Sequence, residues 1–204
     1  SMIIGTAGFT AAECVQKLER SGMTPASGPV LVTGATGGVG SVAVKLLAQL
    51  GYEVAAVTGK EDKHDFLRSL GASEILSREE ANAGSDKPML AERWGGVVDT
   101  VGGDILFNGV KSLRYGCSLA ACGLVAAPVF SASVLPFILR HVNLLGIDSV
   151  QLPIEEKAEI WHRLGDEWLM DLSDLEEVLT LDDLSSAIDR ILSGQMVGRG
   201  VVHL

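Results

Sequence analysis

"VLVTGATGGVG", residues 30–40, is an apolar stretch that runs directly into a glycine-rich turn. A buried strand, a tight turn and a helix N-terminus, in this order, form the phosphate-binding unit of many nucleotide-binding folds. The turn departs from the usual G-x-G-x-x-G fingerprint at its first position, which is Ala35. The next two positions, Gly37 and Gly40, let the backbone approach a pyrophosphate and let the helix pack closely on the strand. We therefore predict a dinucleotide cradle here.

Segments typical of strands and of helices alternate on both sides of this turn. Short apolar runs predict strands at 29–34, 52–59, 73–76, 95–103, 116–125 and 144–150. Amphipathic runs predict helices at 10–22, 38–51, 63–72, 104–113 and 131–141. Nearly continuous apolar strands that alternate with helices indicate a parallel sheet covered on both faces. The predicted fold class is therefore α/β, a Rossmann-type doubly wound parallel sheet.

The regular alternation of strand-like and helix-like segments ends after residue 150. An acidic amphipathic helix is predicted over 154–169, and its inward-facing side chains are Ile160, Trp161, Leu164 and Trp168. A second helix is predicted after Asp182 and Asp183, and 198–204 predicts a final strand with no obvious partner in the sheet. We divide the chain into a nucleotide-binding domain, residues 1–170, and a C-terminal segment, residues 171–204.

Composition excludes several classes of protein. The 204 residues carry a formal net charge of −10, and a protein that neutralises nucleic-acid phosphates needs a surplus of Lys and Arg. We therefore expect no nucleic-acid partner. No apolar run reaches the roughly 18 residues of a membrane span, and the first residues lack the features of a secretion signal. We expect a cytoplasmic protein without a membrane partner.

The three cysteines, Cys14, Cys117 and Cys122, are scattered in apolar contexts and form no C-x-x-C pair. Zinc sites need closely spaced Cys and His ligands, which these positions do not offer. We expect free thiols in a reducing compartment and no metal site.

The end of the second predicted strand distinguishes the two nicotinamide dinucleotides. An NAD site usually carries Asp or Glu there, bonded to the ribose hydroxyls, whereas this chain has Thr58, Gly59 and Lys60. A hydroxyl, a free backbone N–H and a cation suit a 2′-phosphate, which favours NADPH. Additional positive potential is expected from Lys63, His64 and Arg78, and the adjacent carboxylates that oppose it are Glu61 and Asp62.

Two further strand ends, "DTVGG" (99–103) and "ACGLV" (121–125), are expected to face the rest of the cofactor, because ligands cross the carboxyl ends of the strands in such sheets. We predict that Asp99 caps its own turn and has no catalytic role. Nothing near Cys122 in the sequence marks it as a nucleophile.

The motifs "GTAGFTA", "VLVTGATGGVG", "VVDTVGG" and "FILRHVNLLGIDSV" resemble the medium-chain dehydrogenase/reductase superfamily, and within it the zinc-independent quinone oxidoreductase and acrylyl-coenzyme A reductase-like branch. The resemblance runs from about residue 2 to residue 204, and the A-x-G-x-x-G form of the fingerprint is common in that branch. It implies NADPH-dependent hydride transfer to the activated C=C bond of a small molecule, such as an enoyl thioester, or to a quinone.

The resemblance also implies cofactor-binding residues. Those implied for the pyrophosphate are Gly37, Gly38 and Val39, and those for the 2′-phosphate are Thr58, Gly59 and Lys60, with Arg78 nearby. Those implied for the path to the nicotinamide are Val101, Gly102, Cys122, Gly123 and Leu124. The strand that holds Ile147, Asp148 and Ser149 is implied to lie beside the nicotinamide and to form a homodimer through its edge near 144–150.

The family also has an N-terminal catalytic domain, a GroES-like β-barrel, to which we find no match in this sequence. The C-terminal segment is implied to return to that domain, so Arg199 and the final strand are expected to be misplaced, frayed or paired with another molecule. The chain alone is expected to bind NADPH and to be largely inactive. No catalytic residue or proton donor is assigned.

Two other functions are considered. The first is a non-catalytic Rossmann module for oligomerisation or redox sensing, in which the glycine turn is only structural. The second, an extended short-chain dehydrogenase, is disfavoured, because that class places a Tyr-x-x-x-Lys pair on a helix. Neither Tyr52 nor Tyr115 has a lysine four residues on.

Overall fold

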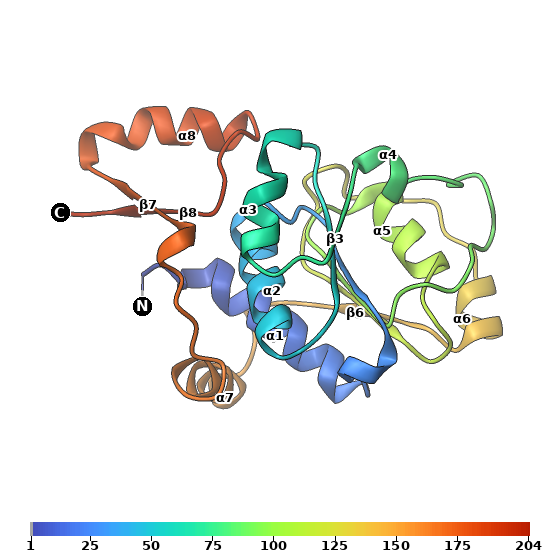
Figure 1. Ribbon diagram of the computed structural model, residues 1–204. Helices are drawn as coiled ribbons and strands as arrows, with labels where there is room; N and C mark the ends of the chain where they lie inside the picture. The colour runs from blue at the N-terminus through green and yellow to red at the C-terminus, as the bar shows by residue number, and fades with distance from the viewer. Residues whose placement is uncertain (1) are drawn as a thin grey trace.

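A single six-stranded parallel sheet forms the centre of the molecule (Figure 1). The structure, a computed structural model, describes residues 2–204. The strands are β1 (Val30–Val32), β2 (Val54–Val57), β3 (Glu74–Leu76), β4 (Gly96–Asp99), β5 (Ser118–Ala121) and β6 (Asn143–Gly146). Their order, β3-β2-β1-β4-β5-β6, is that of a Rossmann-type doubly wound sheet. The predicted fold class is confirmed.

Helices cover both faces of this sheet. They are α1 (Gly5–Arg20), α2 (Gly38–Gln49), α3 (His64–Ser69), α4 (Arg78–Ala81), α5 (Gly103–Lys111), α6 (Leu135–Arg140) and α7 (Ile154–Gly165). Successive strand side chains point to opposite faces. In β1, Val30 and Val32 therefore join the core layer under α1 and α2, whereas Leu31 joins the layer under α5. The continuous apolar run of β1 is explained by burial on both sides.

Helix α1 begins earlier than its sequence predicts. The predicted helix was 10–22, whereas α1 starts at Gly5. Glycine is a poor helix former, and this stretch contains Gly5 and Gly8. Packing explains the difference, because α1 packs along α2, and Gly8 lies beside Val42 of that helix. The packing of α1 against α2 outweighs the low helix propensity of the two glycines.

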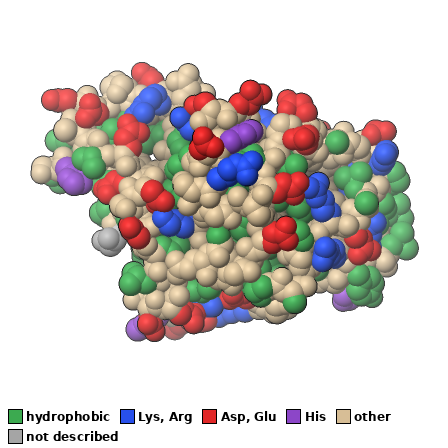
Figure 2. Space-filling view, viewed as in Figure 1, with side chains coloured by type: hydrophobic (Ala, Val, Ile, Leu, Met, Phe, Trp, Pro, Cys, Tyr) green, Lys and Arg blue, Asp and Glu red, His purple; other side chains and the backbone are tan. Residues whose placement is uncertain are grey.

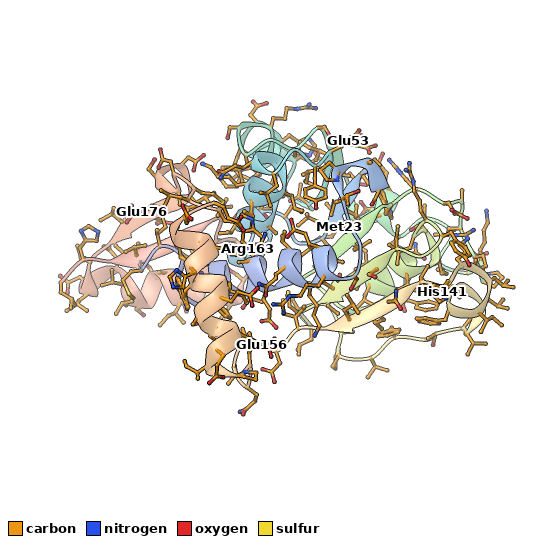
Figure 3. All side chains as sticks on the ribbon, turned by 90° about the horizontal axis from the view of Figure 1, so that it is seen from below. Met23, Glu53, His141, Glu156, Arg163 and Glu176 are labelled. Atoms are coloured by element: carbon orange, nitrogen blue, oxygen red, sulfur yellow. The ribbon has the colours of Figure 1, made fainter. Side chains whose placement is uncertain are left out.

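Helix α7 crosses α1 on the outer side of the molecule (Figure 3). Arg163 of α7 donates from Nη2 to Oε2 of Glu19 on α1 at 2.9 Å, and its guanidinium lies 3.5 Å from the ring centre of Trp168. The predicted inward residues Ile160, Leu164 and Trp168 are buried. The prediction for Trp161 is wrong, because that side chain is 41% exposed. Its ring packs against Phe9 of α1, with 5.6 Å between the ring centres, so only part of the ring is covered.

A second, two-stranded sheet lies in the C-terminal residues 171–204, called the C-terminal unit below. It contains β7 (Glu176–Leu179), α8 (Leu184–Leu192) and β8 (Arg199–Val202), and β7 pairs with β8 in parallel. The final strand therefore has a partner within the chain, contrary to the expectation that it would be unpaired. The sequence did not reveal β7, because its Glu-Glu-Val-Leu sequence lacks a two-residue alternation.

Strand β6 is shorter than predicted. It ends at Gly146, so residues 147–150 do not extend the edge strand as expected. The turn after it is held by Oδ1 of Asp148, which accepts hydrogen bonds from the N–H groups of Val150 and Gln151. Among residues 2–204, no helix has the length and apolar character needed to cross a membrane.

Candidate functional site

A cavity of about 900 Å³ lies at the carboxyl ends of β1, β2 and β4, between the sheet and the C-terminal unit. Eight of the residues predicted to bind a cofactor line it. They are Gly37, Gly38, Thr58, Gly59, Lys60, Arg78, Val101 and Gly102. Segments that are far apart in the sequence thus meet at one place, as expected for the carboxyl edge of a parallel sheet.

The glycine turn between β1 and α2 forms the floor of this cavity. Helix α2 begins at Gly38, and its N-cap residue, Gly37, provides no side-chain cap, so the first-turn N–H groups are free for a ligand. A Cβ on Gly40 would lie 2.3 Å from the carbonyl oxygen of Gly34 and 2.8 Å from Cα of Ala35. The third glycine is therefore required for strand–helix packing, as predicted. Ala35 is tolerated, because its φ is not positive.

Arg199, at the start of β8, reaches over this helix end. Its Nε donates to the carbonyl oxygen of Ile3 at 3.0 Å, and its Nη1 lies 2.9 Å from where a Cβ on Gly38 would be. Within residues 2–204 no carboxylate forms a salt bridge with it, and burial lowers its pKa. A cation beside the positive end of a helix dipole is unfavourable unless an anion lies between them. The expectation that Arg199 would be misplaced is wrong, and sequence reasoning missed it as a site residue.

Two further cations line the cavity at the end of β2. Nζ of Lys60 donates to the carbonyl oxygen of Met196 at 2.7 Å, and the guanidinium of Arg78 lies over Gly59. Burial lowers the pKa of Lys60, and the nearby cations Lys63 and Arg78 lower it further, against the opposing effect of Asp62. A site where cations lower one another's pKa favours an anionic ligand.

The neighbouring charged residues do not enter the cavity. Asp62 forms a salt bridge with Lys63 at 2.8 Å, so the carboxylate that argued against a phosphate is paired elsewhere. Neither Glu61 nor His64 lines the cavity. Thr58 is buried, and its Oγ1 accepts the N–H of Lys60 at 3.1 Å, which shapes the turn.

Asp99 at the end of β4 caps its turn, as predicted. Its carboxylate accepts hydrogen bonds from the hydroxyl of Thr33 at 2.7 Å and from the N–H of Gly102 at 2.8 Å. Burial raises the pKa of Asp99, and these two donors oppose the rise. The carboxylate holds β1 and the β4–α5 turn at the rim of the cavity.

The other predicted site residues do not line the cavity. Cys122 donates from Sγ to the carbonyl oxygen of Asp99 at 3.4 Å, and Val39 and Ile147 pack against the core layer under α1 and α2. Gly123 has no room for a side chain, because a Cβ would lie 1.9 Å from the carbonyl oxygen of Thr100.

Three more predicted residues lie on the surface or in a turn. Leu124 is exposed, Asp148 holds the turn after β6, and Oγ of Ser149 lies 3.0 Å from Oγ1 of Thr10 on α1. The structure thus separates these positions from the cavity, and their part in cofactor binding stays a prediction.

The C-terminal unit supplies the remaining wall, which sequence reasoning did not predict. Apolar side chains of α8 face the cavity with a helical spacing, and they are Leu184, Ala187, Ile188 and Ile191. This amphipathic spacing is visible in the sequence. The position of the helix is not, because it depends on the pairing of β8 with β7.

A family model described as zinc-binding dehydrogenase matches residues 38–166. The chain belongs to this family. It is 50% identical over 205 residues to acrylyl-CoA reductase AcuI of Ruegeria pomeroyi, and 44% identical over 206 residues to the putative quinone oxidoreductase YhfP of Bacillus subtilis. Both alignments cover 100% of this chain and 62% of the relative. The predicted resemblance to the medium-chain superfamily and its branch is confirmed.

Solved structures of similar proteins agree with this assignment. The yhdH oxidoreductase of Salmonella enterica in complex with NADP is 45% identical, with a TM-score of 0.93, and the chain spans 62% of that protein's length. The Bacillus subtilis yhfP protein with NAD bound is 44% identical, with a TM-score of 0.96, over the same share.

The name of the family refers to zinc. Residues 2–204 contain no group of three or more His, Cys, Asp or Glu side chains placed to hold a metal ion. The described residues therefore do not fit a zinc ion, and the roles proposed next involve no metal.

Proposed function

We propose that the chain is the cofactor-binding part of an NADPH-dependent oxidoreductase. The whole protein would reduce an activated C=C bond, in an enoyl thioester such as acrylyl-CoA, or a quinone. The observation that carries the proposal is the convergence of a free helix N-terminus with Arg199, Lys60 and Arg78 on one cavity. Four sources of positive potential suit a dinucleotide with three phosphate groups.

The residues present fit NADPH better than NADH. No carboxylate follows β2 at the position where an NAD site usually binds the ribose hydroxyls. Thr58, Gly59 and Lys60 stand there instead and line the cavity, with Arg78 beside them. Of the two similar structures above, one holds NADP and the other NAD, so the argument rests on this chain's own residues.

Each part of the site has a definite task in this proposal. The first turn of α2 and Arg199 bind the pyrophosphate, and Lys60 with Arg78 binds the 2′-phosphate. The β4–α5 turn, fixed by Asp99 and including Val101 and Gly102, orients the remainder of the dinucleotide. NADPH supplies a hydride when it is bound, and the apolar side chains of α8 keep water from that side of the cavity.

For the whole protein we propose a cytoplasmic homodimer that acts on a small molecule. Among residues 2–204, the edge strand β6 pairs only with β5, and Leu144 on it is partly exposed. Figure 2 shows apolar side chains gathered at the end of the molecule that carries α6, whereas acidic and basic side chains are interspersed elsewhere on this face. We also propose that the C-terminal unit, residues 171–204, packs in the whole protein against a further catalytic domain that lies outside this chain.

The accessible edge strand also supports a second candidate, a non-catalytic module for oligomerisation or redox sensing. Val134, Ile138 and Leu139 add a large exposed apolar surface near it. Under this alternative the chain would associate through this surface without using a nucleotide.

Calorimetric titration of the chain with NADPH and NADH tests the proposal. We expect NADPH to bind at least about tenfold more tightly, because one charge-assisted interaction with the 2′-phosphate contributes that much. Arg199→Ala should weaken both nucleotides. The matched control is Arg68→Ala, which removes an exposed cation of α3 that does not line the cavity and should change neither. Failure of both nucleotides to bind would favour the second candidate.

A further inference from the structure

The end of the segment that connects α8 to β8, together with the first residue of β8, crosses the glycine turn as a strap (residues 196–199, the C-terminal strap). Three hydrogen bonds fasten it to the nucleotide-binding part of the chain. Lys60 Nζ donates to the carbonyl oxygen of Met196 at 2.7 Å, the N–H of Gly198 donates to the carbonyl oxygen of Thr36 at 3.0 Å, and Arg199 binds Ile3 as described above. The strap thus runs from the β2 end of the cavity to the N-terminus of α2.

The bond from Lys60 to Met196 uses one of the three N–H donors of the ammonium group. The other two are free for a ligand in the cavity that Lys60 lines. A lysine side chain loses considerable rotamer entropy when it is held in one place. Because the carbonyl group of Met196 already holds the ammonium group before a ligand binds, less side-chain entropy is lost on binding.

We propose that the C-terminal strap is a positioning element for the 2′-phosphate of NADPH. The carbonyl oxygen of Met196 holds the ammonium of Lys60 toward the cavity, so the C-terminal unit contributes to the preference for NADPH over NADH. This inference rests on the proposed function, since it assigns part of that function's cofactor selectivity to residues outside the Rossmann sheet. The charged groups that face Lys60 are Asp62, Lys63 and Arg78.

Two glycines allow the strap to be moved with a matched control. Gly198 has φ +65°, and a Cβ there would lie 2.5 Å from the carbonyl oxygen of Leu175, so Gly198→Ala should displace the strap. Gly51 has φ +82°, a Cβ there would meet no atom within 4 Å, and it does not line the cavity. Gly51→Ala therefore introduces similar backbone strain away from the strap and without that clash.

The test is the ratio of the dissociation constants of NADH and NADPH, measured by calorimetry. We expect Gly198→Ala to lower this ratio about tenfold, which corresponds to loss of one charge-assisted bond, and Gly51→Ala to leave it unchanged. Lys60→Met should lower the ratio to a similar extent, and adding Gly198→Ala to Lys60→Met should lower it no further. An equal rise of both constants in Gly198→Ala would overturn the inference, and so would an additive effect in the double variant.

A second measurement uses the unmodified chain and therefore does not depend on the folding of a variant. Amide exchange at Gly198 should slow on addition of 2′,5′-ADP but not of 5′-AMP, because only the former carries the 2′-phosphate. Equal slowing by both nucleotides, or none by either bound nucleotide, contradicts the inference. If neither NADPH nor NADH binds the unmodified chain, the proposed function itself fails.

Discussion

In the β1–α2–β2 unit every strand residue is buried, whereas in the β7–α8–β8 unit Val178 is 58% exposed and Ile188 of α8 is 51% exposed. Both units are a parallel strand pair joined by a helix. The first lies inside a six-stranded sheet with helices on both faces, and the second has two strands only. A two-stranded sheet is marginally stable by itself. The same local motif is thus part of the buried core in the six-stranded sheet. In the C-terminal unit it is a more exposed cover over one side of the cavity.

The largest expected difference between the two units comes from substituting one glycine in each. Gly40→Ala forces a Cβ against the backbone of Gly34 and Ala35 and should cost about 3 kcal/mol of unfolding free energy, as other severe overpacking does. Gly200→Ala meets only the mobile ends of the Met196 and Leu179 side chains and should cost less than about 1 kcal/mol. Urea unfolding of both variants measures the two losses of unfolding free energy. Equal losses would show that the two units do not differ in how tightly they are packed.

A smaller loss is expected from the buried carboxylate of Asp99. Asp99→Ala leaves the hydroxyl of Thr33 and the N–H of Gly102 without their acceptor and should cost about 2 kcal/mol. Asp99→Asn keeps one acceptor oxygen and should lose less. The counterpart in the C-terminal unit is Asp183, which caps Thr180 at an exposed site, and Asp183→Ala should have the smaller effect in the same urea assay.

The two regions should also respond to pH in opposite directions. Burial raises the pKa of Glu13 on α1, where Oε2 has no hydrogen-bond partner, while the N–H and hydroxyl of Thr180 lower the pKa of Asp183. The raised group contributes stability that is present below its unfolded pKa of about 4.3 and is lost as pH rises through its folded pKa. The lowered group contributes stability that is present above its unfolded value and is lost as pH falls through its folded pKa.

Glu13→Gln measures the first of these effects. It should be close to neutral at pH 4 and stabilising by about 1 kcal/mol at pH 8, because it removes the cost of burying a charged carboxylate whose Oε2 has no partner. Urea unfolding across this range checks the slope. A constant difference between the variant and the unmodified chain would show that Glu13 keeps an ordinary pKa.

The smallest effect is expected at the tether between the two regions. Lys45 of α2 pairs with Asp174 of the C-terminal unit at 2.6 Å, at a partly exposed site. Lys45→Ala should cost about 0.5 kcal/mol, and less at high salt. A double-mutant cycle with Asp174→Ala isolates the pair, and amide exchange in β7 should rise more than in β1. A coupling above about 2 kcal/mol would show that this tether contributes more than an exposed ion pair does.

Sequence reasoning predicted the sheet and the glycine turn because both depend on local features. Buried parallel strands are apolar along their whole length, and Gly37 and Gly40 follow one of them directly. It missed the start of α1 at Gly5, because packing against α2 compensates for glycine's poor helix propensity. It also misjudged Trp161, whose exposure depends on how α7 packs against α1.

The residues of the candidate site likewise fall into those that local sequence predicts and those that it does not. Thr58, Gly59, Lys60 and Arg78 could be predicted, because each lies at or just after a strand whose end is readable from the sequence. Arg199 and Met196 could not, because the pairing of β8 with β7 brings them to the cavity, and Met196 lies 136 residues from Lys60 in the chain.

The sequence by itself determined the strands of the six-stranded sheet, the helices between them and the glycine turn that defines a phosphate-binding cradle, since periodicity and glycine positions are local properties of the chain. Only the tertiary structure decided that the C-terminal unit closes one side of that cradle and that the carbonyl oxygen of Met196 takes the ammonium of Lys60. Contacts between residues distant in the chain depend on the relative placement of whole elements, which no short stretch of sequence encodes.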